Sequence, residues 1–109
     1  LVHIHLKTKA VTPVDISGTF FDLTPAGGAD GMAFADGNAY VIFPAMVVRV
    51  TPTTANWTKA KAAWTKVPYG MTDAVATPNG LYLLNGQSVR FGLGLTPNPF
   101  AIARFTGSF

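Results

Sequence analysis

The chain has 109 residues, of which 49% are hydrophobic and 12% charged, so it has the length of one domain and about half the usual charge density. This composition excludes a disordered chain and a nucleic-acid-binding tail, and the net charge of +3 comes from few charges. The absence of cysteine excludes disulfides, thiolate nucleophiles and cysteine-ligated metals. Glutamate is absent as well, so the side-chain carboxylates of the chain are those of five aspartates, Asp15, Asp22, Asp30, Asp36 and Asp73.

Short apolar runs, many of them alternating, predict strands along the whole chain. In order, these lie at 1–6, 11–16, 31–35, 39–43, 46–50, 62–67, 73–77, 81–84 and 100–105. Turn residues such as Asp36-Gly37-Asn38 and Pro78-Asn79-Gly80 separate them. The fold class predicted is all-β, with one helical alternative at 54–64, where Asn56 could cap an alanine- and lysine-rich stretch.

The sequence contains no segment that could cross a membrane as a helix. Its longest apolar stretches are about ten residues, against the roughly 20 that a spanning helix needs. The first residues already alternate like a strand, without a charged and apolar leader. We therefore expect the sequence to begin within a fold, after processing or as a fragment.

An internal repeat links the two halves of the chain. Residues 29–42 align with 72–84, which places Asp30 and Asp73 43 residues apart, and each copy contains a small-residue strand, an Asp/Asn-Gly turn and an aromatic strand. A strand with one basic residue follows each copy, at 47–50 and 102–105. A period near 43 residues with about four strands is typical of propeller blades. The alternative is an eight-stranded sandwich with coincidental hairpins.

Several motifs resemble a known family in their order and spacing. They are LVHIHLKTKAVTPV at 1–14, ADGMAF at 29–34, GLYLLNGQ at 80–87 and PNPFAIARF at 97–105. Together they resemble the six-bladed β-propellers of the senescence-marker-protein, gluconolactonase and luciferin-regenerating-enzyme type, most closely the C-terminal third. The resemblance implies about two four-stranded antiparallel blades, at 11–51 and 62–106, with 1–10 belonging to the preceding blade.

The length departs from that family, because six blades of this period need roughly 250 residues. Two blades cannot close a ring, and their outer faces and strand edges would be exposed. The expected partners are therefore the remainder of the propeller or further copies of the same chain. The first of these is the expectation we favour.

The resemblance also implies a divalent cation, commonly calcium, at one mouth of the central channel. Hard cations prefer oxygen ligands, and the resemblance places acidic side chains at the starts of inner strands. Asp30 occupies the family's P-D-G position, with Ala29 in place of proline, and Asp73 is the matching aspartate of the second repeat. The alternative role for Asp30 is to cap the turn at 27–31. Asp36 and Asn79 are expected to be turn residues with positive φ.

Other chemistry has little support in the sequence. His3 and His5 lie two residues apart, a permissible metal spacing, but without a third ligand they favour a surface pair. No serine has the context of a hydrolase triad, and Gly92-Leu93-Gly94 is not a dinucleotide-binding motif. Asn56-Trp57-Thr58 is an N-glycosylation sequon, which favours an extracellular or secretory location.

The activity that the resemblance implies is metal-dependent hydrolysis of a small lactone or ester. Asp30 would be a metal ligand in such a site, whereas no catalytic residue can be assigned. The competing interpretation is a noncatalytic secreted propeller that acts as a binding or structural protein, including a self-assembling short-chain propeller.

Overall fold

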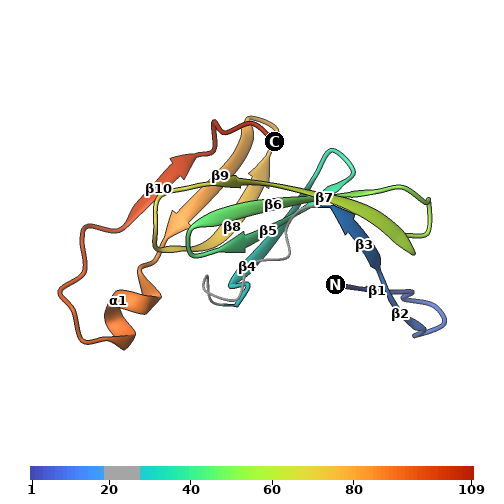
Figure 1. The fold of residues 1–109 in the computed structure, drawn as a ribbon, viewed down its shortest axis with the longest axis horizontal. Helices are drawn as coiled ribbons and strands as arrows, with labels where there is room; N and C mark the ends of the chain where they lie inside the picture. The colour runs from blue at the N-terminus through green and yellow to red at the C-terminus, as the bar shows by residue number, and fades with distance from the viewer. Residues whose placement is uncertain (19–27) are drawn as a thin grey trace.

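The computed structural model describes residues 1–18 and 28–109, except for the side chains of Ser88 and Val89. This part of the chain is mostly β, with antiparallel sheets and one five-residue helix, so the all-β prediction is confirmed (Figure 1). The strands in chain order are β1 (Val2–Ile4), β2 (Val11–Pro13), β3 (Asp15–Gly18), β4 (Gly31–Ala35), β5 (Asn38–Phe43), β6 (Met46–Pro52), β7 (Lys59–Lys66), β8 (Met71–Thr77), β9 (Gly80–Asn85) and β10 (Ala101–Arg104). The helix α1 (Ser88–Gly92) lies between β9 and β10. Asp22, and Gly27 of the expected turn at 27–31, lie outside the described residues.

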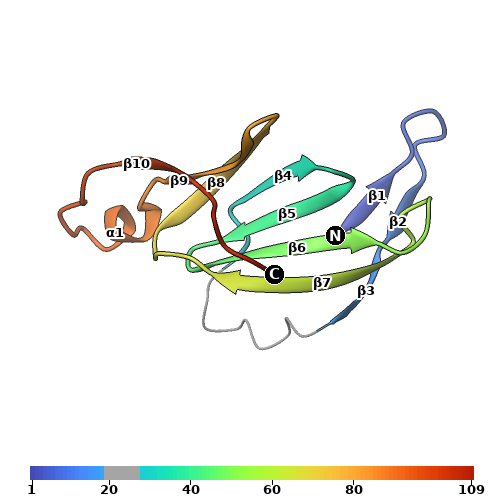
Figure 2. The same cartoon turned by 90° about the horizontal axis from the view of Figure 1, so that it is seen from above.

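The larger sheet is an antiparallel meander with one added strand. Strands β4, β5, β6 and β7 pair with their neighbours in sequence, and β3 joins the outer edge by parallel pairing with β7 (Figure 2). Residues 53–58 form bends and turns before β7 begins at Lys59, so the helical alternative at 54–64 is wrong. The meander runs from Gly31 to Lys66 and thus crosses the boundary between the ranges 11–51 and 62–106, whose division into blades stays a prediction.

The smaller sheets complete the fold. Strands β8, β9 and β10 form a three-stranded sheet with β9 in the middle, and β1 pairs with β2 in a separate hairpin. The β1–β2 hairpin and the helix α1 lie at opposite ends of the long axis of the molecule (Figure 1). Because β10 pairs on one side only, its outer edge is open among the described residues.

The main contact between the two larger sheets is an apolar cluster. Its buried members come from β4, β5 and β6 on one side and from β8 and β9 on the other, namely Ala33, Ile42, Val47, Met71, Leu81 and Leu83. Phe105 and Phe109 of the C-terminal segment pack against this cluster. Burial of these side chains on both sheets stabilises the contact, since each aliphatic side chain contributes about 1.5–3 kcal/mol when fully buried.

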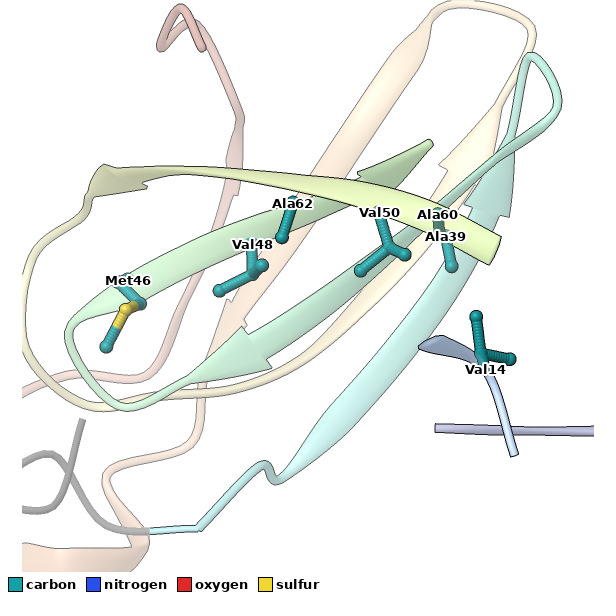
Figure 3. Close-up of a cluster of buried hydrophobic side chains, with 7 residues drawn as sticks. All are labelled: Val14, Ala39, Met46, Val48, Val50, Ala60 and Ala62. Atoms are coloured by element: carbon teal, nitrogen blue, oxygen red, sulfur yellow. The ribbon is translucent and has the colours of Figure 1, made fainter. Parts of the chain in front are cut away.

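A second apolar cluster covers the opposite face of the larger sheet. Most of its buried side chains project from β5, β6 and β7, and Val14 faces them from the link between β2 and β3 (Figure 3). The members are Val14, Ala39, Met46, Val48, Val50, Ala60 and Ala62. The larger sheet is therefore apolar on both faces, which is the pattern of a sheet with neighbours on each side.

The two hairpins turn in different ways. Asp36 and Gly37 form the two-residue turn between β4 and β5 with φ values of 49° and 73°, as a type I′ turn requires. Pro78 and Asn79 form the turn between β8 and β9, where only the following Gly80 has positive φ (127°). The expectation of positive φ is thus confirmed for Asp36 and wrong for Asn79, because the proline before it selects a different turn.

The strand register revises the alignment of the repeat. Tyr40 lies opposite Ala33 and Tyr82 lies opposite Val75, so the matching pairs are 42 residues apart. An irregularity between Met71 and Asp73 inserts one residue into β8. Asp73 follows this irregularity and lies opposite Leu84, as Gly31 lies opposite Ile42, so the 42-residue offset matches Asp73 with Gly31 and not with Asp30.

Loss of buried volume between the two sheets should destabilise the fold strongly. Ile42 is fully buried in the cluster between them. We expect Ile42→Ala to lower the free energy of unfolding by about 2–5 kcal/mol, measured by urea denaturation. The matched control is Ile4→Ala on the exposed β1, for which the expected loss is below about 1 kcal/mol. Equal losses in both variants would contradict this packing.

Candidate functional site

The first strands of the two antiparallel sheets begin side by side. Gly31 at the start of β4 lies against Thr72 and Asp73 at the start of β8. A Cβ atom at residue 31 would lie 2.7 Å from Asp73 Cα and 2.9 Å from the Thr72 carbonyl oxygen, both backbone atoms. Only glycine therefore allows the two strands to approach this closely.

The far ends of the same two hairpins also lie together. A groove of about 570 Å³ is lined by residues of both tips, including Asp36 from the β4–β5 turn and Pro78 from the β8–β9 turn. Since starts meet starts and tips meet tips, the β4–β5 and β8–β9 hairpins run in the same direction. The residues at the start of each hairpin are thereby brought to one end of the molecule.

Asp30 and Asp73 lie at this end on neighbouring strands. Asp30 is exposed at the rim of an apolar groove of about 530 Å³, and its backbone N–H donates to the Ile42 carbonyl oxygen at 2.9 Å. Asp73 is exposed as well, and its Oδ1 accepts a 2.8 Å hydrogen bond from the Ala74 N–H. Both carboxylates keep oxygens free for solvent or a ligand.

The carboxylates of Asp30 and Asp73 are ligands of the kind that a hard cation prefers, but a complete coordination shell needs more of them. Carboxylate oxygens are the ligands that calcium prefers, and the approach of β8 to Gly31 brings a carboxylate of one strand beside the start of the other. Within residues 1–18 and 28–109, no group of three or more histidine or acidic side chains could hold a metal. Asp30 lines a groove beside Met32 and Val41, whereas Asp73 lines a hollow beside Val75 and Leu84, so each carboxylate offers a ligand on its own face of the packed sheets.

The two histidines of the first hairpin differ in their surroundings. His3 lies in β1 opposite Thr12, whereas His5 follows the strand and its Nδ1 lies 3.0 Å from Thr8 Oγ1. Thr8 also donates its backbone N–H to the same ring nitrogen at 3.3 Å. The arrangement is that of a surface turn.

The sequon lies in the loop between β6 and β7. Asn56 is exposed, and its Oδ1 accepts hydrogen bonds from the Thr58 backbone N–H at 3.3 Å and from Thr58 Oγ1 at 2.8 Å. Trp57 has a positive φ of 57° and packs its ring edge-on against Phe34, with centroids 6.0 Å apart. The loop therefore directs the tryptophan inward and leaves the asparagine accessible.

Sequence reasoning missed the polar clamp formed by Gln87. This side chain is 3% exposed, donates from Nε2 to the Asn98 carbonyl oxygen at 2.6 Å and accepts from the Asn98 N–H at 2.7 Å. Arg90 also bonds to this connection, since its Nε and Nη2 both donate to the Thr96 carbonyl oxygen. These bonds hold the long β9–β10 connection in place. The proline-rich segment at 97–99 indicated an ordered connection in the sequence, but nothing in it identified Gln87 as the side chain that binds it.

Comparison with known proteins gave no match to a family model, a curated protein sequence or a solved structure. In the described part of the chain, no helix is long and apolar enough to cross a bilayer.

A side chain at residue 31 should separate β4 from β8. We expect Gly31→Ala to lower the free energy of unfolding by about 1–3 kcal/mol in urea denaturation, because the new methyl group meets backbone atoms that cannot move aside easily. Gly28→Ala is the control, since a Cβ there has no atom within 4 Å, and it should be neutral or slightly stabilising. A neutral Gly31→Ala variant would show that the two strands do not approach closely.

Proposed function

We propose that the chain is part of a gluconolactonase-like β-propeller and that it contributes to metal-dependent hydrolysis of small lactones or esters. The observation that carries this proposal is the side-by-side start of β4 and β8, which gathers Asp30 and Asp73 at one end of two parallel hairpins. The sequence motifs at 29–34 and 80–87, which resemble that family, fall on these same hairpins.

The chain path supports this interpretation. It descends through the meander from β4 to β7 and then returns to place β8 next to β4, with the two sheets packed face to face. A propeller chain follows the same path, in which the outermost strand of one blade leads to the innermost strand of the next. On this interpretation β4 and β8 are innermost strands and line the channel.

Asp30 and Asp73 would hold the cation, for which calcium is the proposed identity. A bound divalent cation polarises a substrate carbonyl and stabilises the negative charge that develops on its oxygen. Calcium takes 6–8 oxygen ligands, so two carboxylates need further oxygens from water or from other parts of the assembly. The general base would also lie outside this pair.

A noncatalytic role as a binding or structural protein is the second candidate. Several large apolar side chains are exposed on the outer face of the β8–β10 sheet, which favours assembly with another protein surface. This candidate needs no cation.

Calcium binding and lactone hydrolysis test the proposal together. We expect Asp30→Asn and Asp73→Asn each to weaken calcium affinity at least about tenfold in isothermal titration, because affinity depends on the number of charged ligands. In the assembled propeller that contains this chain, hydrolysis of aldonolactones and aryl esters, measured by pH-stat, should be lost on chelator treatment, return on addition of calcium and fall in both variants.

The control is Asp36→Asn, which keeps a residue suited to the positive φ of its turn and lies at the opposite end of the hairpin. Its calcium affinity should equal that of the unmodified chain. Calcium binding without hydrolysis would favour the noncatalytic role, and equal calcium affinity in all four proteins would contradict the assignment of Asp30 and Asp73.

A glycan on Asn56 is expected when the chain is secreted by eukaryotic cells. The exposed side chain in a loop is accessible to the transferase. The secreted protein should show a mass increase that a glycosidase removes and that Asn56→Gln abolishes. Thr58→Ser is the matched control, because it preserves the sequon and should keep the glycan. An unmodified mass in the secreted protein would argue against this site.

A further inference from the structure

The two hairpins carry the same pattern of side chains on one face. Residues directly opposite each other in antiparallel strands share a face of the sheet. One face of the larger sheet therefore carries two rows, Gly31–Ile42–Val47 and Ala33–Tyr40–Arg49. The corresponding face of the smaller sheet carries Asp73–Leu84–Ile102 and Val75–Tyr82–Arg104. Each set ends with a tyrosine beside an arginine.

In the larger sheet this face is covered. Ile42 and Val47 are fully buried against β8 and β9. Phe109 covers the tyrosine and arginine, with its ring centroid 5.9 Å from that of Tyr40 and 4.8 Å from Arg49 Cζ. Within the chain, this pattern of residues therefore binds an apolar surface and an aromatic side chain.

In the smaller sheet the same pattern is exposed. Val75 is 56% exposed, Leu84 38% and Ile102 73%, although their counterparts Ala33, Ile42 and Val47 are buried. A shallow hollow of about 180 Å³ lies between these side chains, lined also by Tyr82 and Asp73. We call this surface the β8–β10 outer face.

The repeat also identifies the surface that would cover it. Within the chain, the covering residues of the second hairpin are Ala74, Ala76, Leu81 and Leu83. Their counterparts, 42 residues earlier, are Met32, Phe34, Ala39 and Val41, which lie on the opposite side of the β4–β5 hairpin. Met32 is 45% exposed and Phe34 58% exposed, whereas Ala39 is fully buried in the cluster with Val14. We call this surface the β4–β5 outer face.

We propose that the β8–β10 outer face of one copy of this chain docks on the β4–β5 outer face of a second copy. The contact resembles the sheet packing that the chain forms within itself, except at Asp73, whose side chain takes the position of Gly31 and holds the strand starts further apart. It goes beyond the proposed hydrolase and does not depend on it, because it rests on the register and burial of the two hairpins.

Aromatic and charged groups on the two faces are complementary. The β8–β10 outer face presents Arg104 beside Tyr82, and the β4–β5 outer face presents the Phe34–Trp57 pair, which can cover an arginine as Phe109 covers Arg49. Asp30 and Asp36 line the two grooves of the β4–β5 outer face, and each carries the charge opposite to that of Arg104. The grooves measure about 620 and 530 Å³ and provide room for apolar side chains.

The proposed contact is heterologous, because two different faces meet. Such contacts form a closed ring where the rotation between copies allows it and an open chain where it does not. Each copy must then have two partners, and blocking either face must stop growth at one end.

Sedimentation velocity of the 109-residue chain over a range of concentrations tests the association. We expect species heavier than 11.5 kDa whose share rises with concentration. Ile102→Lys and, on the other face, Met32→Lys should each weaken association at least about tenfold, because each buries an unpaired charge in an apolar contact. Leu84→Lys should act as Ile102→Lys does. Leu93→Lys is the matched control, since Leu93 is 68% exposed in the loop after α1 and lies on neither face.

A mixture of two variants tests the orientation. Ile102→Lys keeps an intact β4–β5 outer face and Met32→Lys keeps an intact β8–β10 outer face, so their equimolar mixture should form a dimer that grows no further. Circular dichroism and urea denaturation should show both variants folded. A chain that stays monomeric at all concentrations would overturn the proposal. Self-association that Leu93→Lys weakens as much as Ile102→Lys does, or a mixture that stays monomeric, would overturn it as well.

Discussion

The contact between the β4–β5 and β8–β9 hairpins is the constraint on which the rest of the structure depends. Neither a three-stranded sheet nor a short hairpin buries enough apolar surface to be stable alone, so each needs a partner layer. Gly31 permits the approach at one end, and the side chains around Ile42 and Leu83 fill the space between the sheets. The same contact sets the direction of both hairpins and thereby decides which residues share an end of the molecule.

The β4–β5 and β8–β9 hairpins pair their strands in the same register, but they carry different residues where their first strands begin. The offset of 42 residues gives Asp73 the position that Gly31 occupies in the first hairpin, and the extra residue in β8 comes before it. One repeat thus presents a carboxylate where the other must have no side chain. Asp30 remains one position earlier, where its backbone still bonds to β5. The two aspartates lie on adjacent strands without being equivalent, and Asp30 lines a groove of the β4–β5 outer face whereas Asp73 lines the hollow of the β8–β10 outer face.

The sequence predicted the elements that local chemistry determines. Asp36-Gly37 has one favourable hairpin geometry, and the strands beside it were located within a residue. The parallel pairing of β3 with β7 and the clamp around Gln87 were not predicted, because they join segments whose partners no local pattern identifies. For the candidate site, the sequence selected Asp30 and Asp73, but the 42-residue offset, which matches Asp73 with Gly31, appears only in the register.

The proposed association of copies and the proposed cation site both involve the starts of β4 and β8. Within one copy, the start of β8 lies against the start of β4. If the β8–β10 outer face of one copy docks on the β4–β5 outer face of a second copy, Asp73 of the first and Asp30 of the second lie on the two surfaces that meet. Calcium needs more oxygens than one chain's two aspartates supply, and such stacking adds them without any new residue type. A cation at this end would then bind best to associated copies, and by linkage its binding would stabilise their association.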